Sequence, residues 1–358
     1  MNHLRWIMIA LIPSMILSCW IHLSAYSSYK KNLNLRYNSI MIIQDANEDS
    51  NYIKALIYAQ RLKQNQIYLN NPSKKKIDYI LIYDNRRFGN MVVALRHAIS
   101  LCLHLKCSVI FHKDIWFLEK QPLMDLPFRF ESFKKLDQYN LSQSNYLHGN
   151  FYYQQYYPYF KNTEDMVKII QSIVNPSIPS VDIDKDALYI HIRSGDIFKR
   201  FVPNIKYGQP PLCFYTTILK KWNFSKIFLI SEDLLNPVIS KLIDEGATLL
   251  VTDLPKTLGY LSRAKNIAFG RGTFVREVLR LNNSEKTIFS YDFNQVYKAW
   301  VDFFSKEQFK MVTQYDMEPT KEYLKFLLSE NWLNFNFQRK IMLESKCNDF
   351  VKVGAKVK

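Results

Sequence analysis

The sequence predicts an α/β protein with two Rossmann-like domains facing a cleft, preceded by an N-terminal transmembrane helix. Three observations predict this: short apolar runs separated by helical periods, a charge-free apolar segment near the N-terminus, and glycines concentrated where predicted strands end. Alternating strands and helices are typical of parallel sheets with helices on both faces. The 358 residues are enough for one large or two medium domains.

The composition excludes several classes of protein. Hydrophobic residues make up 48% of the chain and aromatic residues 15%, while there are only 9 Gly and 13 Pro. These values exclude a disordered, collagen-like or low-complexity protein. Five Cys in 358 residues are too sparse for a small scaffold held by disulfides.

The N-terminal segment 6–26 is expected to be a signal-anchor transmembrane helix, with residues 1–5 as a cytoplasmic tail. Its apolar part, 6–23, has no Asp, Glu, Lys or Arg and is long enough to cross a bilayer of about 30 Å. A signal peptide cleaved near Ala25 is the alternative. The bases that follow the segment would, taken alone, favour the opposite orientation. We expect the bulk of the chain to be lumenal.

The formal net charge is +16, from 48 Lys and Arg against 32 Asp and Glu. Such a balance suits nucleic acid, an anionic membrane surface or a phosphate-bearing ligand such as a sugar nucleotide. A location in the secretory pathway removes nucleic acid as a partner. A sugar nucleotide therefore fits better, although much of the charge is also explained as a solvated face.

A lumenal chain should carry glycosylation sequons and cysteines that can pair. Three asparagines head an N-x-S sequence, a number near chance in a chain so rich in Asn: Asn140, Asn223 and Asn282. Four cysteines lie outside the membrane segment: Cys102, Cys107, Cys213 and Cys347. They allow two disulfides in three pairings, and buried free thiols are an equal alternative.

Four segments follow the transmembrane helix. Residues 27–75 are polar and predict a stem, partly helical around 52–69. Residues 76–180 and 181–300 each show strand and helix patterns and predict the two Rossmann-like domains. Residues 301–358 predict a helical extension with a basic tail.

In the first domain, the apolar runs 79–83 and 108–112 predict buried strands, and the helical spacing of 90–105 between them completes a β-α-β unit. The aromatic stretch 116–160 shows no regular pattern. In the second domain, short apolar runs predict strands at 188–192, 227–230, 248–252, 266–269 and 287–291. Apolar residues at helical spacing predict helices at 211–222, 237–245 and 273–281.

Ligands of open α/β sheets bind outside the carboxyl ends of the strands, so these ends are where functional residues are expected. Four of the nine glycines lie at three such ends: Gly89, Gly195, Gly270 and Gly272. The first end, after 79–83, has Arg87 and Asn90 around Gly89, where a helix N-terminus favours an anion. The alternative is an ordinary turn with solvated arginines.

The second strand end carries the strongest signal. His191 and Arg193 point to the same side of an extended chain, and Asp196 follows the flexible Gly195. Arginine binds a diphosphate bidentately and neutralises a leaving group, and Asp196 can orient a neighbour or act as a base. A structural ion pair is the alternative. A polar His-x-Arg in an apolar strand is costly to bury without a role.

The third strand end, 270–274, predicts a phosphate-binding nest with Thr273 as the helix N-cap, or an N-cap alone. A fourth end, 231–233, offers the carboxylates of Glu232 and Asp233 to ribose or base donors, or simply caps the next helix.

These motifs and their order resemble the superfamily that joins α1,2-, α1,6- and protein O-fucosyltransferases. Residues 87–90 (RFGN) resemble the turn that opens its acceptor-side half, and 191–196 (HIRSGD) are similar to its His-x-Arg-x-x-Asp strand end. Residues 227–233 (IFLISED) resemble its strand ending in Ser/Thr-Asp-Asp, and 272–274 (GTF) its segment near the donor diphosphate.

The resemblance implies a GT-B fold, GDP-fucose as the donor substrate, inversion at the anomeric carbon, and neither metal nor cofactor. It implies a Golgi or ER membrane protein of type II with a glycan or glycoprotein acceptor. Arg193 would bind the β-phosphate, Asp233 the nucleoside, and Thr273 and Phe274 the diphosphate, with Asn90 near the reacting centre.

Three sets of residues follow from the strand ends and the resemblance together. The catalytic set is Arg193, Asp196 and Asn90. The donor-binding set is His191, Arg193, Gly195, Asp233, Gly272, Thr273 and Phe274. The acceptor-side set is Arg87, Gly89 and Asn90.

The chain departs from the family pattern in its second motif, and a carboxylate base just downstream of that motif is absent. Ser194 stands where many α1,2 and α1,6 members have a second arginine, which leaves the linkage open. The base is Asp196, Asp84 or absent. Four alternative functions stay open: a glycosyltransferase with another nucleotide-sugar donor, a sulfotransferase, a metal-dependent transferase using Asp182 and Asp184, and an inactive binding protein.

Overall fold

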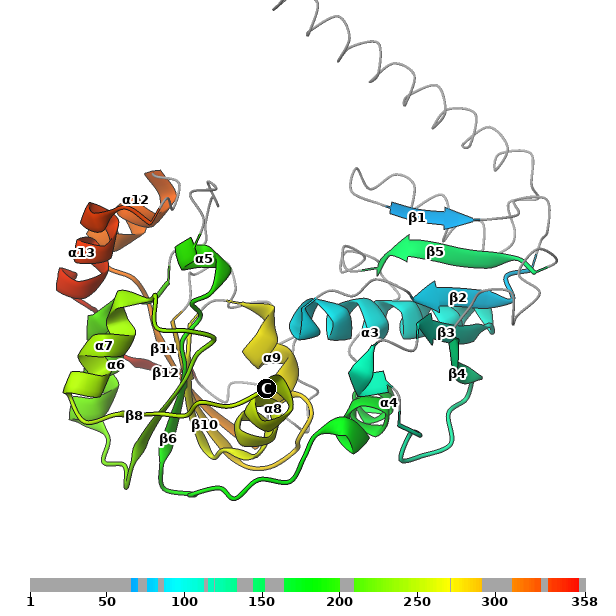
Figure 1. The fold of residues 1–358 in the computed structure, drawn as a ribbon, viewed down its shortest axis with the longest axis horizontal. Coiled ribbons are helices and arrows are strands. Elements are labelled where there is room, and N and C mark those ends of the chain that lie inside the picture. Colours follow the sequence, from blue (N-terminus) through cyan, green and yellow to red (C-terminus); the bar gives the residue numbers. More distant parts are fainter. Residues whose placement is uncertain are drawn as a thin grey trace, which may run out of the picture.

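A computed structural model describes residues 66–69, 76–82, 87–112, 115–118, 120–133, 144–151, 164–199, 209–270, 272–291, 311–329 and 334–353. The predicted transmembrane segment 6–26 and most of the predicted stem lie outside these residues. The described chain forms two mainly parallel β-sheets flanked by helices, so the predicted α/β class is confirmed (Figure 1).

The first sheet has five strands in the order β1-β5-β2-β3-β4, with only β1 antiparallel to its neighbour. Its strands are β1 (Gln66–Leu69), β2 (Tyr79–Ile82), β3 (Ser108–His112), β4 (Phe130–Phe133) and β5 (Tyr146–Asn150). Its helices are α3 (Phe88–Leu105) and α4 (Glu164–Val174), with short 3₁₀ turns η1 (Trp116–Leu118) and η4 (Asn175–Ser177). The predicted β-α-β unit is therefore β2-α3-β3.

The second sheet has seven strands in the order β12-β11-β10-β9-β6-β7-β8, with only β12 antiparallel. Its strands are β6 (Leu188–His191), β7 (Ile227–Ile230), β8 (Thr248–Leu249), β9 (Asn266–Phe269), β10 (Lys286–Tyr291), β11 (Val312–Met317) and β12 (Val351–Val353). Its helices are α5 (Asp196–Lys199), α6 (Leu212–Lys221), α7 (Pro237–Asp244), α8 (Leu254–Arg263), α9 (Thr273–Leu279), α12 (Lys321–Ser329) and α13 (Asn336–Glu344).

Some expectations were wrong about which segments form strands. The end of the predicted partly helical stretch 52–69 is strand β1, and the stretch 116–160 contains β4 and β5. The predicted helical extension 301–358 does contain α12 and α13, but it also adds β11 and β12 to the second sheet. Backbone hydrogen bonding to an existing sheet, which sequence pattern does not reveal, determines these strands.

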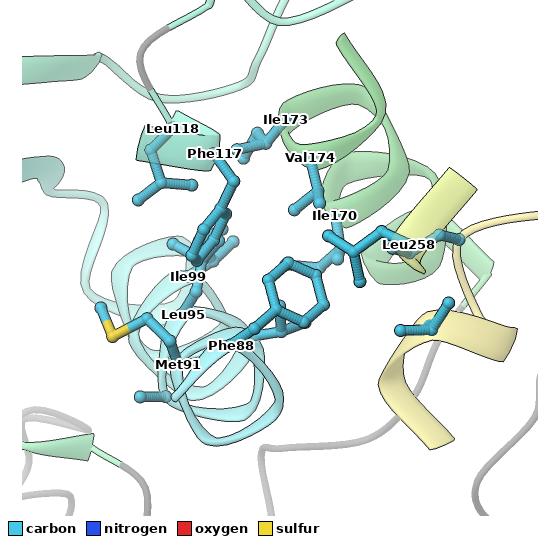
Figure 2. Close-up of a cluster of buried hydrophobic side chains, with 14 of the residues drawn as sticks. Phe88, Met91, Leu95, Ile99, Phe117, Leu118, Ile170, Ile173, Val174 and Leu258 are labelled. Carbon is cyan, nitrogen blue, oxygen red and sulfur yellow. The ribbon is translucent and has the colours of Figure 1, made fainter. Parts of the chain in front are cut away.

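One hydrophobic core runs through both halves. It joins the face of the first sheet that carries α3 and α4 to the face of the second sheet that carries α8 and α9. Figure 2 shows Phe88 of α3, Val174 of α4 and Leu258 of α8 in the same cluster. The opposite face of the second sheet has its own cluster, including Ile190 of β6 and Val238 of α7. Figure 1 shows α8 and α9 on the side of the second sheet nearest α3.

Helix α3 is the one helix of the described residues that is long and apolar enough to cross a membrane. It is 72% buried within the protein and forms the central helix of the shared core.

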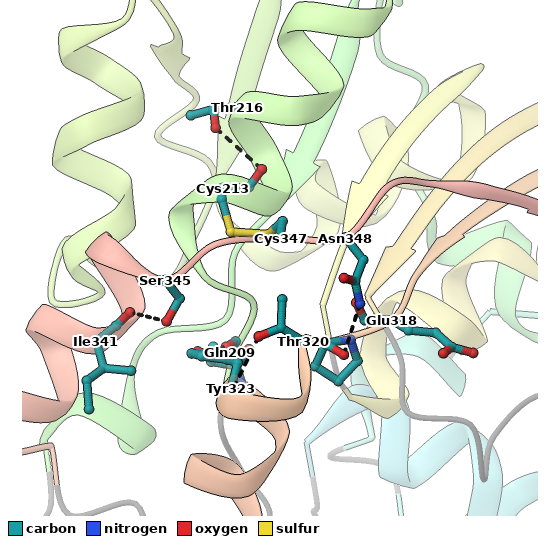
Figure 3. Close-up of a disulfide and its surroundings, with 11 residues drawn as sticks. Gln209, Cys213, Thr216, Glu318, Thr320, Tyr323, Ile341, Ser345, Cys347 and Asn348 are labelled. Atoms are coloured by element: carbon teal, nitrogen blue, oxygen red, sulfur yellow. Dashed lines mark hydrogen bonds between the residues drawn. A yellow bond between two sulfur atoms is a disulfide. The ribbon is translucent and has the colours of Figure 1, made fainter.

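The cysteines divide into one disulfide and two free thiols. Cys213 at the start of α6 is bonded to Cys347, which follows α13 (Figure 3). Cys102 and Cys107 are free and buried, and the Cys102 thiol donates a 2.7 Å hydrogen bond to the Cys107 carbonyl. The sequence left disulfides and buried free thiols open as alternatives, and the structure contains one pair of each kind.

A candidate active site where the strand ends of the two sheets meet

The order of the strands places a ligand-binding position at the centre of each sheet. In the second sheet, β7 and β8 extend from one side of β6, and β9, β10 and β11 extend from the other. The switch of direction lies between β6 and β9, where open α/β sheets bind their ligands beyond the carboxyl ends. In the first sheet the equivalent switch lies between β2 and β5. Three of the strand ends singled out from the sequence follow β2, β6 and β9.

These switch points face each other, because the helix that follows β2 touches the helix that follows β9. A Cβ on Gly89 of α3 would lie 2.7 Å from both Cα and N of Phe274 in α9. Only glycine fits such an approach without a shift of the backbone. The predicted first and third motifs are thus in direct contact, although 185 positions separate Gly89 from Phe274 along the chain.

A hydrogen bond reinforces this contact. The Thr273 hydroxyl donates to Asn90 Oδ1 at 2.7 Å, so the two residues are brought together across the halves. Both side chains are partly exposed. The Phe274 ring lies between its neighbours, with centroids 5.2 Å from His191 and 6.0 Å from Phe88. Aromatic packing therefore connects the end of β6 to both helices.

Arg193 is held by its backbone and reaches from β6 towards α9. Asn236 Nδ2 donates to the Arg193 carbonyl at 3.0 Å. A Cβ on Gly272, whose φ is +147°, would lie 3.6 Å from Arg193 NH1, so the guanidinium runs along this glycine. The predicted second and third motifs share one surface. Arg193 supplies its positive charge at the switch point of the second sheet.

His191 is not a second cation in this surface. Burial, and then the nearby Arg193 charge, lower the pKa of His191 from 6.5 to about 4. The imidazole is therefore neutral at pH 7, and its ring packs against Phe274. The positive charge that acts on it is that of Arg193.

Asp233 holds the turn that follows Arg193. Its Oδ1 accepts hydrogen bonds from the Ser194 hydroxyl, from Gly195 N at 3.3 Å and from Leu235 N at 3.1 Å. Ser194 Oγ in turn accepts from Asn236 N at 3.0 Å. These two bonds give the Ser194 hydroxyl a structural role in the turn. The nucleoside contact expected of Asp233 stays a prediction, and Oδ1 already has three internal donors.

Sequence reasoning did not predict an ion pair between Arg87 and Glu232 across the halves. Arg87 NH1, before α3, lies 3.4 Å from Glu232 Oε1, after β7, and both side chains are about half exposed, at 53% and 50%. Gly195, at φ +56°, lies under the same carboxylate, which a Cβ there would strike. Glu232 is thus a half-exposed carboxylate that lies between strand ends of the two halves. In the sequence, the opposite charges of Glu232 and Arg87, each beside a predicted strand end, could have indicated this ion pair.

Two candidate bases cannot be placed. Asp84 lies outside the described residues, and Asp196 begins α5 but its side chain is outside them too.

Gly270 packs on Pro210, whose Cδ would be 2.5 Å from a Cβ at that position. This contact explains the glycine there by packing.

Among the described residues, no group of three or more His, Cys, Asp or Glu side chains is arranged to hold a metal ion. The pair Asp182 and Asp184 precedes β6 and so lies at the amino end of the sheet, away from this site. Asp184 also accepts hydrogen bonds from Ser225 Oγ at 3.1 Å and from Asp186 N at 3.1 Å. These contacts are those of a structural loop.

The comparisons with known proteins find no matching family model and no similar curated protein. Several solved structures with partial similarity are glycosyltransferases. An α-1,6-fucosyltransferase, NodZ, co-crystallized with GDP is 11% identical, with a TM-score of 0.38 over 61% of this chain and 96% of that chain; the same enzyme is known from Bradyrhizobium.

A family 9 glycosyl transferase from Veillonella parvula is 8% identical, with a TM-score of 0.38 over 74% of this chain and 95% of that chain. The heptosyltransferase TibC in complex with ADP-D-beta-D-heptose is 11% identical, with a TM-score of 0.36 over 60% and 59% of the two chains. At these scores none of the three carries an argument about residue roles in this chain.

Proposed function

We propose that this protein is an inverting, metal-independent glycosyltransferase that transfers fucose from GDP-fucose to a glycan or glycoprotein acceptor. The observation that carries the proposal is the position of Arg193. Its charge lies at the switch point between β6 and β9, beside Gly272, the residue before α9.

A diphosphate leaving group needs its developing charge neutralised by a fixed cation, and Arg193 fits that task. The hydrogen bond from Asn236 to its carbonyl and the turn held by Asp233 fix its backbone before the ligand arrives. The His191 imidazole is neutral at pH 7, so the positive charge offered to the diphosphate here is that of Arg193. The donor-binding residues Thr273 and Phe274 border the same surface.

In the proposed reaction an acceptor hydroxyl oxygen attacks the anomeric carbon of the sugar from the face opposite the diphosphate. The bond from that carbon to the diphosphate oxygen breaks, and its electron pair leaves with GDP, next to Arg193. The hydroxyl proton passes to a carboxylate. We assign this base to Glu232, which lies between the two halves beside Arg87; Asp196 and Asp84 are the other candidates.

The proposed location is the lumen of the Golgi or ER, with residues 6–26 as the membrane anchor. The disulfide between Cys213 and Cys347 supports it, because disulfides form and persist in oxidising compartments.

The test is nucleotide binding by residues 37–358 produced as a secreted protein. GDP, UDP and adenosine 3′,5′-bisphosphate are titrated with and without Mn²⁺, for the wild type, for Arg193→Ala and for the control Arg129→Ala. Arg129 is an exposed arginine of the first half, paired with Glu131.

We expect GDP to bind without metal, Arg193→Ala to weaken it by at least about tenfold, and Arg129→Ala to leave it unchanged. Binding of UDP only with Mn²⁺, or of the bisphosphate, would replace the proposal by a metal-dependent transferase or a sulfotransferase. A folded protein that binds no nucleotide would be an inactive homologue.

A further inference from the structure

A hollow of about 640 Å³ lies at the amino ends of the strands of the second sheet, away from the candidate active site. Four aromatic residues line it, together with charged side chains at its rim: Trp222, Phe224, Phe289 and Tyr315, with Asp186 and Lys265. Nothing in the proposed reaction uses this hollow.

The aromatic residues form a continuous floor. The Phe289 and Tyr315 rings are stacked, with centroids 5.5 Å apart and planes at 14°, and the Trp222 ring lies 5.1 Å from Tyr315. Trp222, Phe224 and Tyr315 are only partly buried, so part of each ring remains accessible. Exposed aromatic faces with polar groups around them suit the apolar C–H faces and hydroxyls of a saccharide.

One of the three sequons borders this floor. Asn223 lies between Trp222 and Phe224 in the turn from α6 to β7, lines the hollow, and is exposed. Ser225, which completes the sequon, is also exposed. A sugar attached to Asn223 Nδ2 would therefore start at the rim of the aromatic floor.

The other two sequons offer no such surroundings. Asn282 uses its side-chain oxygen to accept from Ser284 N at 3.0 Å, which closes the turn after α9, and it does not line the hollow. Asn140 lies outside the described residues. In the folded protein the Ser225 hydroxyl is bound to Asp184 at 3.1 Å, so modification of Asn223 would precede folding of this turn.

From these contacts we infer that Asn223 carries an N-linked glycan whose first sugars lie in the hollow over Trp222 and Tyr315. The inference goes beyond the proposed function but rests on the lumenal location proposed with it. A lipid-diphosphate-linked oligosaccharide is the co-reactant. Asn223 Nδ2 forms a bond to its anomeric carbon, the bond from that carbon to the diphosphate breaks, the lipid diphosphate leaves with the electron pair, and the amide loses one proton.

The experiment uses the full chain made in cells with a secretory pathway. Treatment with peptide N-glycosidase in heavy-isotope water marks an occupied asparagine as labelled aspartate, read by peptide mass spectrometry. A non-reducing peptide map reads the Cys213–Cys347 disulfide in the same sample. We expect a labelled Asn223 and an intact disulfide, loss of one glycan in Asn223→Gln, and retention of the Asn223 glycan in the control Asn282→Gln.

Contact between the glycan and the hollow is read from the rate of enzymatic release. We expect release from the native protein to be at least about tenfold slower than from the denatured protein, because sugars that lie against the aromatic floor must leave it before the enzyme reaches the linkage. Tyr315→Ser should remove this protection, while Phe337→Ala, an exposed aromatic on α13, should not. If Tyr315→Ser does not fold, the native-to-denatured ratio of the wild type decides alone.

Each contrary result overturns the inference in a distinguishable way. An unmodified Asn223 in a protein with the disulfide formed overturns glycosylation in a chain that reached the lumen. An unmodified Asn223 with all cysteines reduced overturns the lumenal location as well. Equal release rates from native and denatured protein overturn contact with the hollow. GDP binding is measured separately, so failure here leaves the transferase proposal standing.

Discussion

Thr273 Oγ1 donates a 2.7 Å hydrogen bond to Asn90 Oδ1, although the two residues are 183 positions apart in the chain. Thr273 begins α9 after β9, and Asn90 lies in the first turn of α3 after β2. The bond therefore fixes the distance between the carboxyl ends of one strand from each sheet. It also leaves the Asn90 amide nitrogen at the edge of the surface that carries Arg193.

Breaking this bond should weaken the junction between the halves. Thr273→Val and Asn90→Ala are each expected to lower the free energy of unfolding by about 1 kcal/mol, the usual net value of one hydrogen bond. In a double-mutant cycle the two effects should couple by about 0.5–1.5 kcal/mol. Urea unfolding of the four proteins measures both quantities. Strict additivity would show that the bond contributes nothing.

Gly89→Ala should destabilise the protein by about 1–3 kcal/mol, because the new Cβ would meet the Phe274 backbone at 2.7 Å and a backbone cannot rotate away. Gly246→Ala is the control: a Cβ there meets nothing within 4 Å, and only the strain of φ +96° remains, about 1–2 kcal/mol. Thermal unfolding compares the two variants. The close contact of α3 with α9 would be refuted by a Gly89→Ala protein as stable as wild type whose sugar transfer is also unchanged.

Glu232→Gln should separate catalysis from stability. The ion pair with Arg87 is half exposed, so its loss should change the free energy of unfolding by less than about 1 kcal/mol. If Glu232 is the base, kcat for sugar transfer should fall by about 10²–10⁴ while GDP binding is retained. Glu245→Gln, an exposed carboxylate of the same half, controls for charge. An unchanged kcat in Glu232→Gln would move the base to Asp196 or Asp84.

Stability should fall in mild acid because of His191. Its folded pKa, about 4, is below the 6.5 of the unfolded chain, so the unfolded state binds the proton first as the pH falls. The stabilisation is complete above pH 6.5 and is lost as the pH falls from there through 4, on the order of 3 kcal/mol in all. His191→Phe should flatten this part of the curve. Burial also lowers the pKa of His97, to about 3, so the stability of the His191→Phe variant should still decline in acid. Identical pH curves for the two proteins would contradict this prediction.

The strands and helices that pack through regular apolar patterns were predictable. β2, β3, β6, β7 and β9 coincide with short apolar runs and were predicted within a residue or two. β11 was not, because it buries polar side chains that satisfy one another: Gln314 Nε2 donates to Asp316 Oδ1 at 2.8 Å and to Ser290 Oγ at 3.2 Å. Such a strand shows no apolar alternation.

Helix α8 was missed for a different reason. It contains Pro255 in its first turn and Gly259 in its middle, two residues that weaken a helical pattern. The glycine is explained by tertiary contact, because a Cβ at Gly259 would lie 2.9 Å from the Pro179 carbonyl. A single sequence does not show that Pro179 lies next to Gly259.

The candidate site was predictable in its parts and not in its assembly. Each strand end was recognisable from a glycine beside an arginine or a hydroxyl. The contacts of Asn90 with Thr273 and of Arg87 with Glu232 depend on how the sheets face each other, which local pattern does not encode. The hydrogen bonds that Asp233 Oδ1 accepts from Ser194 and Gly195 likewise depend on the fold of this turn.

The hydrophobic core that continues from α3 and α4 into α8 and α9 bears on how such a protein can be re-engineered or recombined. Leu258 and Val275 belong to a buried cluster that also contains residues of α3 and α4 in the other half. A chimera that exchanges one half for that of a distant protein of the same fold would leave this shared cluster unmatched, and would be prone to aggregate. New substrate specificity is better sought by changing loops at the strand ends than by exchanging whole halves.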